Sequence, residues 1–210
     1  IEALAFPHPS FRAGQRELAE SVYKCASQGG QMLMQAPTGI GKTAAVLFPA
    51  LKAIATDKHD FLVYLTARTV GRHAAEQALD EMAAAGLQLR RLTLSARDNV
   101  CLSPGRACHG DDCPYARGYY DRLPEALQAA MQQPRLGREN IEQLAREFEI
   151  CPYQLSIDLL PWVDLCVADV HYVYSFNATV ASVCQQRGMR WTVLLDEAHN
   201  LPDRARSMFS

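Results

Sequence analysis

A short glycine-containing loop in this chain carries residues that could bind the phosphates of a nucleotide. In it, Gly39 and Gly41 precede Lys42 and Thr43. Backbone N–H groups of such a loop bind phosphate, the Lys at the head of the next helix reaches the β- and γ-phosphates, and the Thr hydroxyl binds Mg²⁺. The spacing predicts a phosphate-binding loop, although Ala36 stands where the strict Walker A pattern has Gly.

An acidic stretch near the end of the chain could complete such a site. Asp196 and Glu197 follow the apolar run 191–195, and His199 lies two residues further on. An Asp at the end of an apolar strand is a typical Mg²⁺ ligand, and the adjacent Glu is placed to act as general base toward water. We expect His199 to couple the nucleotide state to movement. The alternative is that Asp196 and Glu197 only cap a following helix.

The elements that must position these residues alternate between strands and helices along most of the chain. Apolar runs bounded by turn residues predict strands at 31–36, 61–66, 89–95, 162–168 and 191–195. Helical spacing predicts helices at 12–28, 42–55, 70–85, 122–132 and 139–148. This order predicts an α/β fold with a parallel sheet covered by helices, which places ligands at the carboxyl ends of the strands.

Composition sets broad limits on the function. The chain has 210 residues, of which 49% are hydrophobic and 21% are charged, as is usual for a globular protein. The formal net charge of −2 gives no global signal for nucleic-acid binding, so any such surface must be local. No apolar run is long enough to span a membrane and no signal peptide is visible, so we expect a cytoplasmic protein without a membrane partner.

Four of the seven cysteines lie among Gly, Pro and charged residues, where an unligated buried thiol is not expected. These are Cys101, Cys108, Cys113 and Cys151. A set of this kind suggests a metal site. The usual spacings of structural zinc sites are not matched because no Cys-x-x-Cys pair is present, and four thiolates also suit a [4Fe–4S] cluster. Zinc, an iron–sulfur cluster and four unligated thiols therefore all remain open on spacing alone.

Several of these motifs together resemble one family. The runs that carry the resemblance are 11–16, 64–70, 94–101, 151–153 and 196–200. In this combination the chain resembles the XPD/DinG-type iron–sulfur DNA helicases of superfamily 2. The insert with four cysteines, between the motif Ia-like run and the acidic box, is the narrowest marker. The resemblance implies a RecA-like motor domain and a [4Fe–4S] cluster held by the four cysteines.

The resemblance also implies roles for individual residues. Gln15 is expected to contact adenine, and Mg²⁺ is expected on Thr43 and Asp196. Residues expected to bind ATP are Gln15, Arg16, Pro37, Thr38, Gly39, Ile40, Gly41, Lys42 and Thr43. Residues expected to contact DNA are Arg68, Thr69, Arg97 and Tyr172. For Tyr172, packing in the core is the competing interpretation.

The implied function is ATP-dependent translocation on single-stranded DNA or unwinding of forked duplex, typically 5′ to 3′, in DNA repair. We expect residues 1–96 and 156–210 to form the motor domain and 97–155 the cluster insert. Because the chain begins with Ile1 and ends soon after the acidic box, we expect a piece of a longer protein that hydrolyses ATP slowly by itself. In a eukaryote the protein would be nuclear. The alternatives are a non-translocating iron–sulfur DNA-binding module and another P-loop NTPase with a zinc insert.

Overall fold

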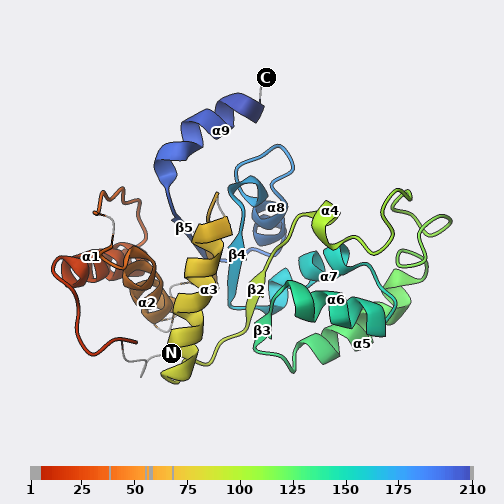
Figure 1. The fold of residues 1–210 in the computed structure, drawn as a ribbon, viewed down its shortest axis with the longest axis horizontal. Coiled ribbons are helices and arrows are strands. Elements are labelled where there is room, and N and C mark those ends of the chain that lie inside the picture. The colour runs from red at the N-terminus through yellow and green to blue at the C-terminus, as the bar shows by residue number, and fades with distance from the viewer. Residues whose placement is uncertain (1–5, 38, 55, 57–58, 68, 209–210) are drawn as a thin grey trace.

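The centre of the molecule is a parallel five-stranded sheet (Figure 1). The computed structural model describes residues 6–37, 39–54, 56, 59–67 and 69–208. The strands are β1 (Phe61–Leu65), β2 (Arg91–Thr93), β3 (Arg135–Leu136), β4 (Leu165–Ala168) and β5 (Trp191–Leu195). Their order across the sheet is β3-β2-β4-β1-β5, and every pairing is parallel. The expected α/β fold with a parallel sheet is confirmed.

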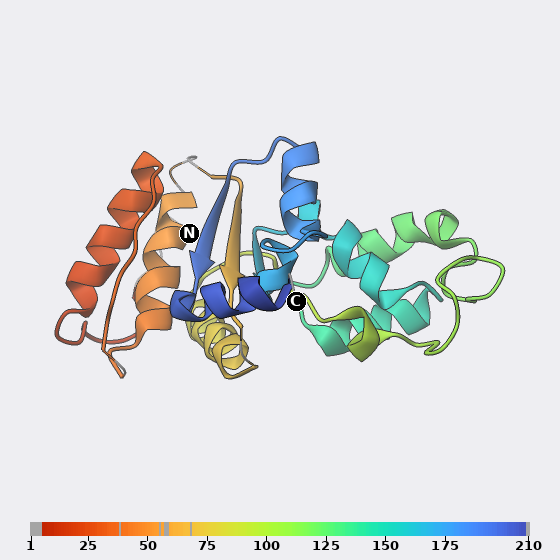
Figure 2. The same cartoon turned by 90° about the horizontal axis from the view of Figure 1, so that it is seen from above.

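Helices connect the strands and cover the sheet (Figures 1 and 2). The α-helices are α1 (Gln15–Gln28), α2 (Lys42–Ile54), α3 (Thr69–Ala84), α4 (Arg97–Val100), α5 (Tyr119–Ala130), α6 (Arg138–Glu147), α7 (Pro152–Asp158), α8 (Thr179–Gln186) and α9 (Leu201–Met208). Short 3₁₀ turns are η1 (Leu160–Trp162), η2 (Val170–Tyr172) and η3 (Ala198–Asn200). Helices expected from helical spacing all form, with ends shifted by a few residues.

Side chains that alternate along β1 divide the core into two layers. Phe61, Val63 and Leu65 pack with residues of α5 to α8, whereas Leu62 and Tyr64 pack with residues of α2 and α3. Strands of a parallel sheet are buried on both faces when helices cover both sides. All five residues of β1 are buried, so this strand is the rigid centre from which the loops at the carboxyl edge extend.

Three of the expected strands differ from the structure. The strand expected at 89–95 is confined to the three residues of β2. Residues 31–37 form no strand, and Leu33 in this segment is 90% exposed. An apolar run becomes a strand only where a neighbouring strand satisfies its backbone groups, and no described strand lies beside this segment. The expected strand 162–168 is shorter, because residues up to Trp162 form η1 and only β4 joins the sheet.

The region expected as the cluster insert, 97–155, shares the core of the sheet. Tyr119, Leu136, Leu144 and Leu155 are buried in the same apolar cluster as one face of β1 and β4. The insert even supplies β3, which pairs with β2. Its helices are therefore held by the sheet as well as by each other.

Candidate functional site

The phosphate loop lies directly before α2. Gly39 and Gly41 have φ angles of 83° and 79°, which side-chain-bearing residues adopt only with strain. Lys42 is the first residue of α2, so the backbone N–H groups of its first turn are available to an anion. Lys42 Nζ donates to the carbonyl of Ala36 at 3.3 Å, which holds the ammonium group over the loop. Thr38 lies outside the described residues.

Residues at the start of α1 contact this loop. Gln15 is 1% exposed; its Nε2 donates to the carbonyl of Gly41 at 3.3 Å, and its Oε1 accepts from the backbone N–H of Arg12 at 2.9 Å. The guanidinium of Arg12 donates to the Gly39 carbonyl. Arg16, which we selected from the sequence, instead pairs with Glu20 on an exposed side of α1. Arg12 was missed, although it stands three residues before Gln15.

The acidic box follows β5 at the carboxyl edge of the sheet. The backbone N–H of Asp196 donates to the Leu65 carbonyl at 2.9 Å, which extends the β1–β5 pairing to the aspartate itself. Glu197 has a φ of 54°, a left-handed conformation that a glutamate adopts only where the surroundings impose it. His199 Nδ1 lies 3.5 Å from Glu197 Oε2. The two side chains are therefore close enough to form a hydrogen bond or an ion pair.

The hydroxyl of Tyr64 joins the phosphate loop to the acidic box. Tyr64 is 1% exposed on the central strand, and its hydroxyl lies close enough to the side chains of Thr43 and Asp196 for both to influence its pKa. Burial, followed by the negative charge of Asp196, raises the pKa of Tyr64, so the phenol stays protonated beside the carboxylate. The two residues expected to bind Mg²⁺ thus lie beside the same buried hydroxyl, that of Tyr64. Sequence reasoning missed it, although a tyrosine in a fully buried strand is a signal for a polar partner.

Three residues expected to contact DNA lie in the helices or the 3₁₀ turn that follow strands at the same sheet edge. Thr69 follows β1 and is exposed, and Arg97 follows β2 with a side chain that is 59% exposed. Tyr172 follows β4, but its hydroxyl donates to the carbonyl of Ser95 at 3.0 Å and its ring packs against the core. Tyr172 therefore packs against the core, as in the competing interpretation, and its hydroxyl joins the segments that follow β2 and β4, whereas its contact with DNA stays a prediction. Arg68 lies outside the described residues.

The four cysteines that are expected to bind a metal all lie in the insert, two near its ends and two inside it. Cys101 ends α4, Cys151 caps α7, Cys113 is buried and Cys108 is exposed in a turn-rich segment. Burial raises the pKa of the Cys151 thiol; the backbone N–H groups of Gln154 and Tyr153 lower it, and the nearby Cys113 and Cys108 raise it further. Within the described residues, no group of three or more His, Cys, Asp or Glu side chains is close enough to hold a metal ion.

Comparison with known families decides the classification. The family model described as DEAD_2 matches residues 66–210, and the model described as DEAD/DEAH box helicase matches residues 13–100. The chain belongs to the DEAD_2 family. It is an XPD-type member of superfamily 2, as expected from the motifs.

Curated relatives of this DEAD_2 chain are helicases. It is 24% identical to a Regulator of telomere elongation helicase 1 homolog of Drosophila yakuba, over 89% of this chain and 24% of the relative. It is also 24% identical to the General transcription and DNA repair factor IIH helicase subunit XPD of Arabidopsis thaliana, over 93% of this chain and 30% of the relative. The chain thus spans less than a third of the length of these two relatives.

The fold has a counterpart among solved structures. A chain described as Truncated XPD superposes with a TM-score of 0.59 over 91% of this DEAD_2 chain and 54% of its own length. At 16% sequence identity, this likeness concerns the fold alone. Among the described residues, no helix is long and apolar enough to cross a lipid bilayer.

Other candidates at the carboxyl edge of the DEAD_2 sheet were missed by the sequence analysis. Arg204 of α9 donates to the carbonyl of Ala67 at 2.7 Å and lies 3.6 Å from Asp169, so α9 crosses the loops that follow β1 and β4. Tyr174 and Phe176, in the loop after η2, are 42% and 78% exposed. Large exposed aromatic side chains are the signal that could have identified them.

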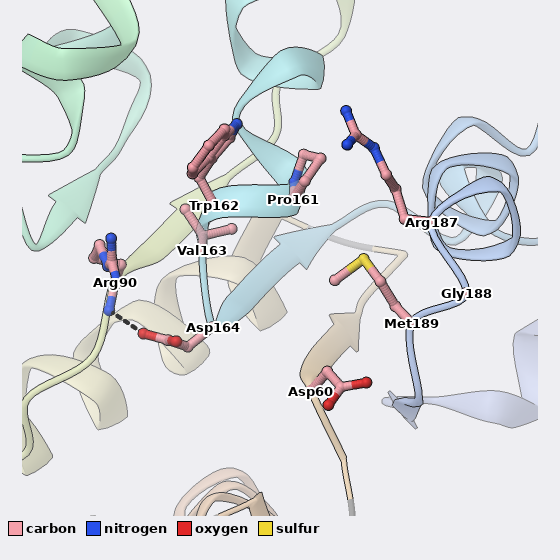
Figure 3. Close-up of a pocket in the computed structure, with 9 residues that line it drawn as sticks. All are labelled: Asp60, Arg90, Pro161, Trp162, Val163, Asp164, Arg187, Gly188 and Met189. Atoms are coloured by element: carbon pink, nitrogen blue, oxygen red, sulfur yellow. Dashed lines mark hydrogen bonds between the residues drawn. The ribbon is translucent and has the colours of Figure 1, made fainter.

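A cavity of about 440 Å³ lies at the opposite edge of the sheet (Figure 3). It is lined by residues that precede strands, including Asp60 before β1, Asp164 before β4 and Met189 before β5. Asp164 accepts a hydrogen bond from the backbone N–H of Arg90 at 2.7 Å, drawn in Figure 3. Because Asp196 stands at the carboxyl ends of the strands, this cavity is distinct from the candidate nucleotide site.

Proposed function

We propose that this chain is the first motor domain of an ATP-dependent DNA helicase that translocates 5′ to 3′ on single-stranded DNA. The observation that carries the proposal is the Tyr64 hydroxyl, which lies beside both Thr43 and Asp196 at the edge where Thr69 also lies. A nucleotide site and a DNA surface at one sheet edge are what a translocating motor needs. Membership of the DEAD_2 family supports the same function.

The chain's residues have distinct roles in ATP hydrolysis under this proposal. Lys42, at the first position of α2, binds the β- and γ-phosphates. Thr43 and Asp196 would hold Mg²⁺, which supplies positive charge beside the transferred phosphate. Glu197 orients water and accepts its proton as general base. His199, 3.5 Å from Glu197, is placed to sense the protonation of that carboxylate.

Binding of the rest of the nucleotide falls to the phosphate loop and the start of α1. The backbone of the loop, from Pro37 through Ile40 and Gly41, surrounds the phosphates, whereas Gln15 is assigned to adenine. Gln15 already donates to the Gly41 carbonyl, so adenine contact would be communicated directly to the loop. Arg12, whose guanidinium contacts the Gly39 carbonyl, is a stronger candidate than Arg16 for a contact near the nucleotide.

The four cysteines fit a [4Fe–4S] cluster by their donor chemistry. All four thiols are free, and four cysteine side chains are the donor set that such a cluster takes. Cys101, Cys108, Cys113 and Cys151 would hold the cluster, which supplies a cross-link within the insert and no redox step in ATP hydrolysis. Arg97, four residues before Cys101, would then contact DNA beside the cross-linked insert.

Substitution of the phosphate-loop lysine tests the motor function. In the whole protein, Lys42→Ala should lower ATPase and unwinding rates at least about 100-fold, because a positioned cation at the transferred phosphate is lost. Lys24→Ala, on the exposed surface of α1, is the matched control and should leave both rates unchanged. If Lys42→Ala unwinds forked DNA at the wild-type rate, the chain is a non-translocating DNA-binding module.

Metal analysis tests the cluster separately from the motor. Protein purified without oxygen should absorb at about 400 nm and contain roughly four irons and four sulfides per chain. Cys151→Ser should lose that absorption, whereas Cys184→Ser, in the buried α8, should keep it. A colourless protein with about one zinc per chain would replace the cluster by a zinc site.

A further inference from the structure

Gly71 of helix α3 lies so close to the acidic box that no side chain would fit at this position without a shift. A Cβ added to Gly71 would lie 2.1 Å from Thr66 Oγ1, 3.1 Å from Thr66 Cβ and 3.2 Å from Asp196 Oδ2. Heavy atoms that are not bonded do not approach to 2.1 Å. Glycine is therefore required at this position because a side chain would overlap its neighbours, and not because of an unusual backbone angle.

Glycine at this position lowers the stability of the helix, so another feature of the structure must favour it. Gly71 is the third residue of the 16-residue α3, where glycine is less favourable than alanine by about 1 kcal/mol. The position is not a cap, because α3 begins at Thr69. What the glycine permits is the approach of the first turn of α3 to Thr66 and to the Asp196 carboxylate.

The Asp196 carboxylate is thereby confined on two sides. Its backbone continues the β1–β5 pairing through the bond to Leu65, and the backbone of Gly71 closes the side toward α3. Thr66, which is 3% exposed, fills the remaining space between β1 and α3. A carboxylate confined in this way can present its oxygens to a metal ion in one direction only.

We propose that Gly71 is a positioning residue for the metal ligand Asp196, which requires the bare backbone of α3 at this point. The proposal rests on the proposed nucleotide site and adds a residue to it. A side chain at position 71 would push the first turn of α3 and the Asp196 carboxylate apart. The binding of metal-bound nucleotide would weaken, whereas the metal-free nucleotide, held by the phosphate loop, would not be affected.

The experiment measures binding of Mn²⁺·ADP by the electron paramagnetic resonance signal of free Mn²⁺, and binding of ADP in EDTA by calorimetry. Gly71→Ala should weaken Mn²⁺·ADP binding at least about tenfold, since displacing a positioned group by an ångström costs that much or more. Binding of ADP in EDTA should stay within about twofold of wild type. Gly137→Ala is the control, because its φ is −84° and its Cβ would meet only Asn140, at 3.6 Å.

A double variant separates this effect from general strain. Thr66→Ala removes the Oγ1 atom that a residue-71 Cβ would overlap, so Thr66→Ala/Gly71→Ala should fold even if Gly71→Ala does not. The contact at 3.2 Å to Asp196 remains in the double variant, which should still bind Mn²⁺·ADP more weakly than Thr66→Ala alone. Equal binding by these two variants would overturn the proposal. Absence of any ADP binding by the wild-type protein would overturn the nucleotide site itself.

Discussion

Removal of the Tyr64 hydroxyl should stabilise the nucleotide-bound state relative to the free protein. Tyr64→Phe keeps the ring, which is 1% exposed in the apolar layer beside α2 and α3, so packing is preserved. The change removes only the hydroxyl, which lies beside the side chains of Thr43 and Asp196. These two side chains are also the expected Mg²⁺ ligands, so we expect the phenol to compete with the metal for Asp196.

The expected magnitude follows from these contacts. A hydrogen bond to a charged group contributes about 1.5–3 kcal/mol, but Asp196 is only partly buried, so water replaces part of the loss. We expect Tyr64→Phe to lower the free energy of unfolding by about 1–2 kcal/mol without ligand. This corresponds to roughly 2–4 °C in Tm per kcal/mol for a chain of this size. With saturating Mg²⁺·ADP the difference should shrink, because the metal then neutralises Asp196.

Linkage turns this difference into a binding prediction. If Tyr64→Phe destabilises the free protein more than the ligand-bound protein, the variant must bind Mg²⁺·ADP more tightly than the wild type. Binding is tighter by about tenfold for each 1.4 kcal/mol of that difference in the free energy of unfolding. Urea unfolding with and without Mg²⁺·ADP, together with calorimetric titration, measures both quantities. Tyr23→Phe, on α1 and 40% exposed, is the control. Weaker binding of Mg²⁺·ADP by Tyr64→Phe would refute the reasoning and place the phenol among the groups that support the bound metal.

Two further predictions concern stability. Asp60 pairs with Arg190 beside β1 and β5, and this pair, above all the side-chain hydrogen bond, lowers the pKa of Asp60. Because both side chains are well exposed, Asp60→Asn should cost only about 0.5–1 kcal/mol in urea unfolding at neutral pH. A folded-state pKa below the ordinary value gives stability that is present above that value and is lost as pH falls through the lowered pKa. The difference between wild type and variant should therefore vanish in strong acid, and a constant difference would contradict the assignment. Tyr119→Phe removes a 2.7 Å bond to Asp158 that links α5 to α7, and should speed proteolysis within the insert without changing ADP binding.

Local pattern was sufficient for the helices and for those strands that find a neighbour in the sheet. The run 191–195 gave β5 with the same ends, and helical spacing gave α2 and α3 within a residue or two. It failed at 31–36, where Met32, Leu33 and Met34 are 40%, 90% and 38% exposed. That run is apolar enough for a strand, but strand formation depends on a neighbour that the local sequence does not contain.

The motif residues of the site could be predicted, whereas the residues that hold them together could not. Lys42 and Asp196 follow recognisable patterns because phosphate and Mg²⁺ impose residue types and spacing. Tyr64 and Gly71 belong to no such pattern in the sequence analysis, and their roles depend on which loops meet at the sheet edge. Contacts between segments far apart in the sequence appear only when the strand order is known.

The arrangement of α3 gives a physical route between the proposed DNA surface and the nucleotide site. Thr69, an exposed residue expected to contact DNA, and Gly71, which abuts Asp196, lie two residues apart in the same helical turn. A hydrogen-bonded turn moves as one unit, so a shift of Thr69 toward bound DNA must change the contact between Gly71 and the carboxylate. Because Thr66 is buried between β1 and α3, that shift cannot be absorbed locally. In this fold, therefore, the residue expected to contact DNA and the glycine beside the expected metal ligand share the first turn of α3.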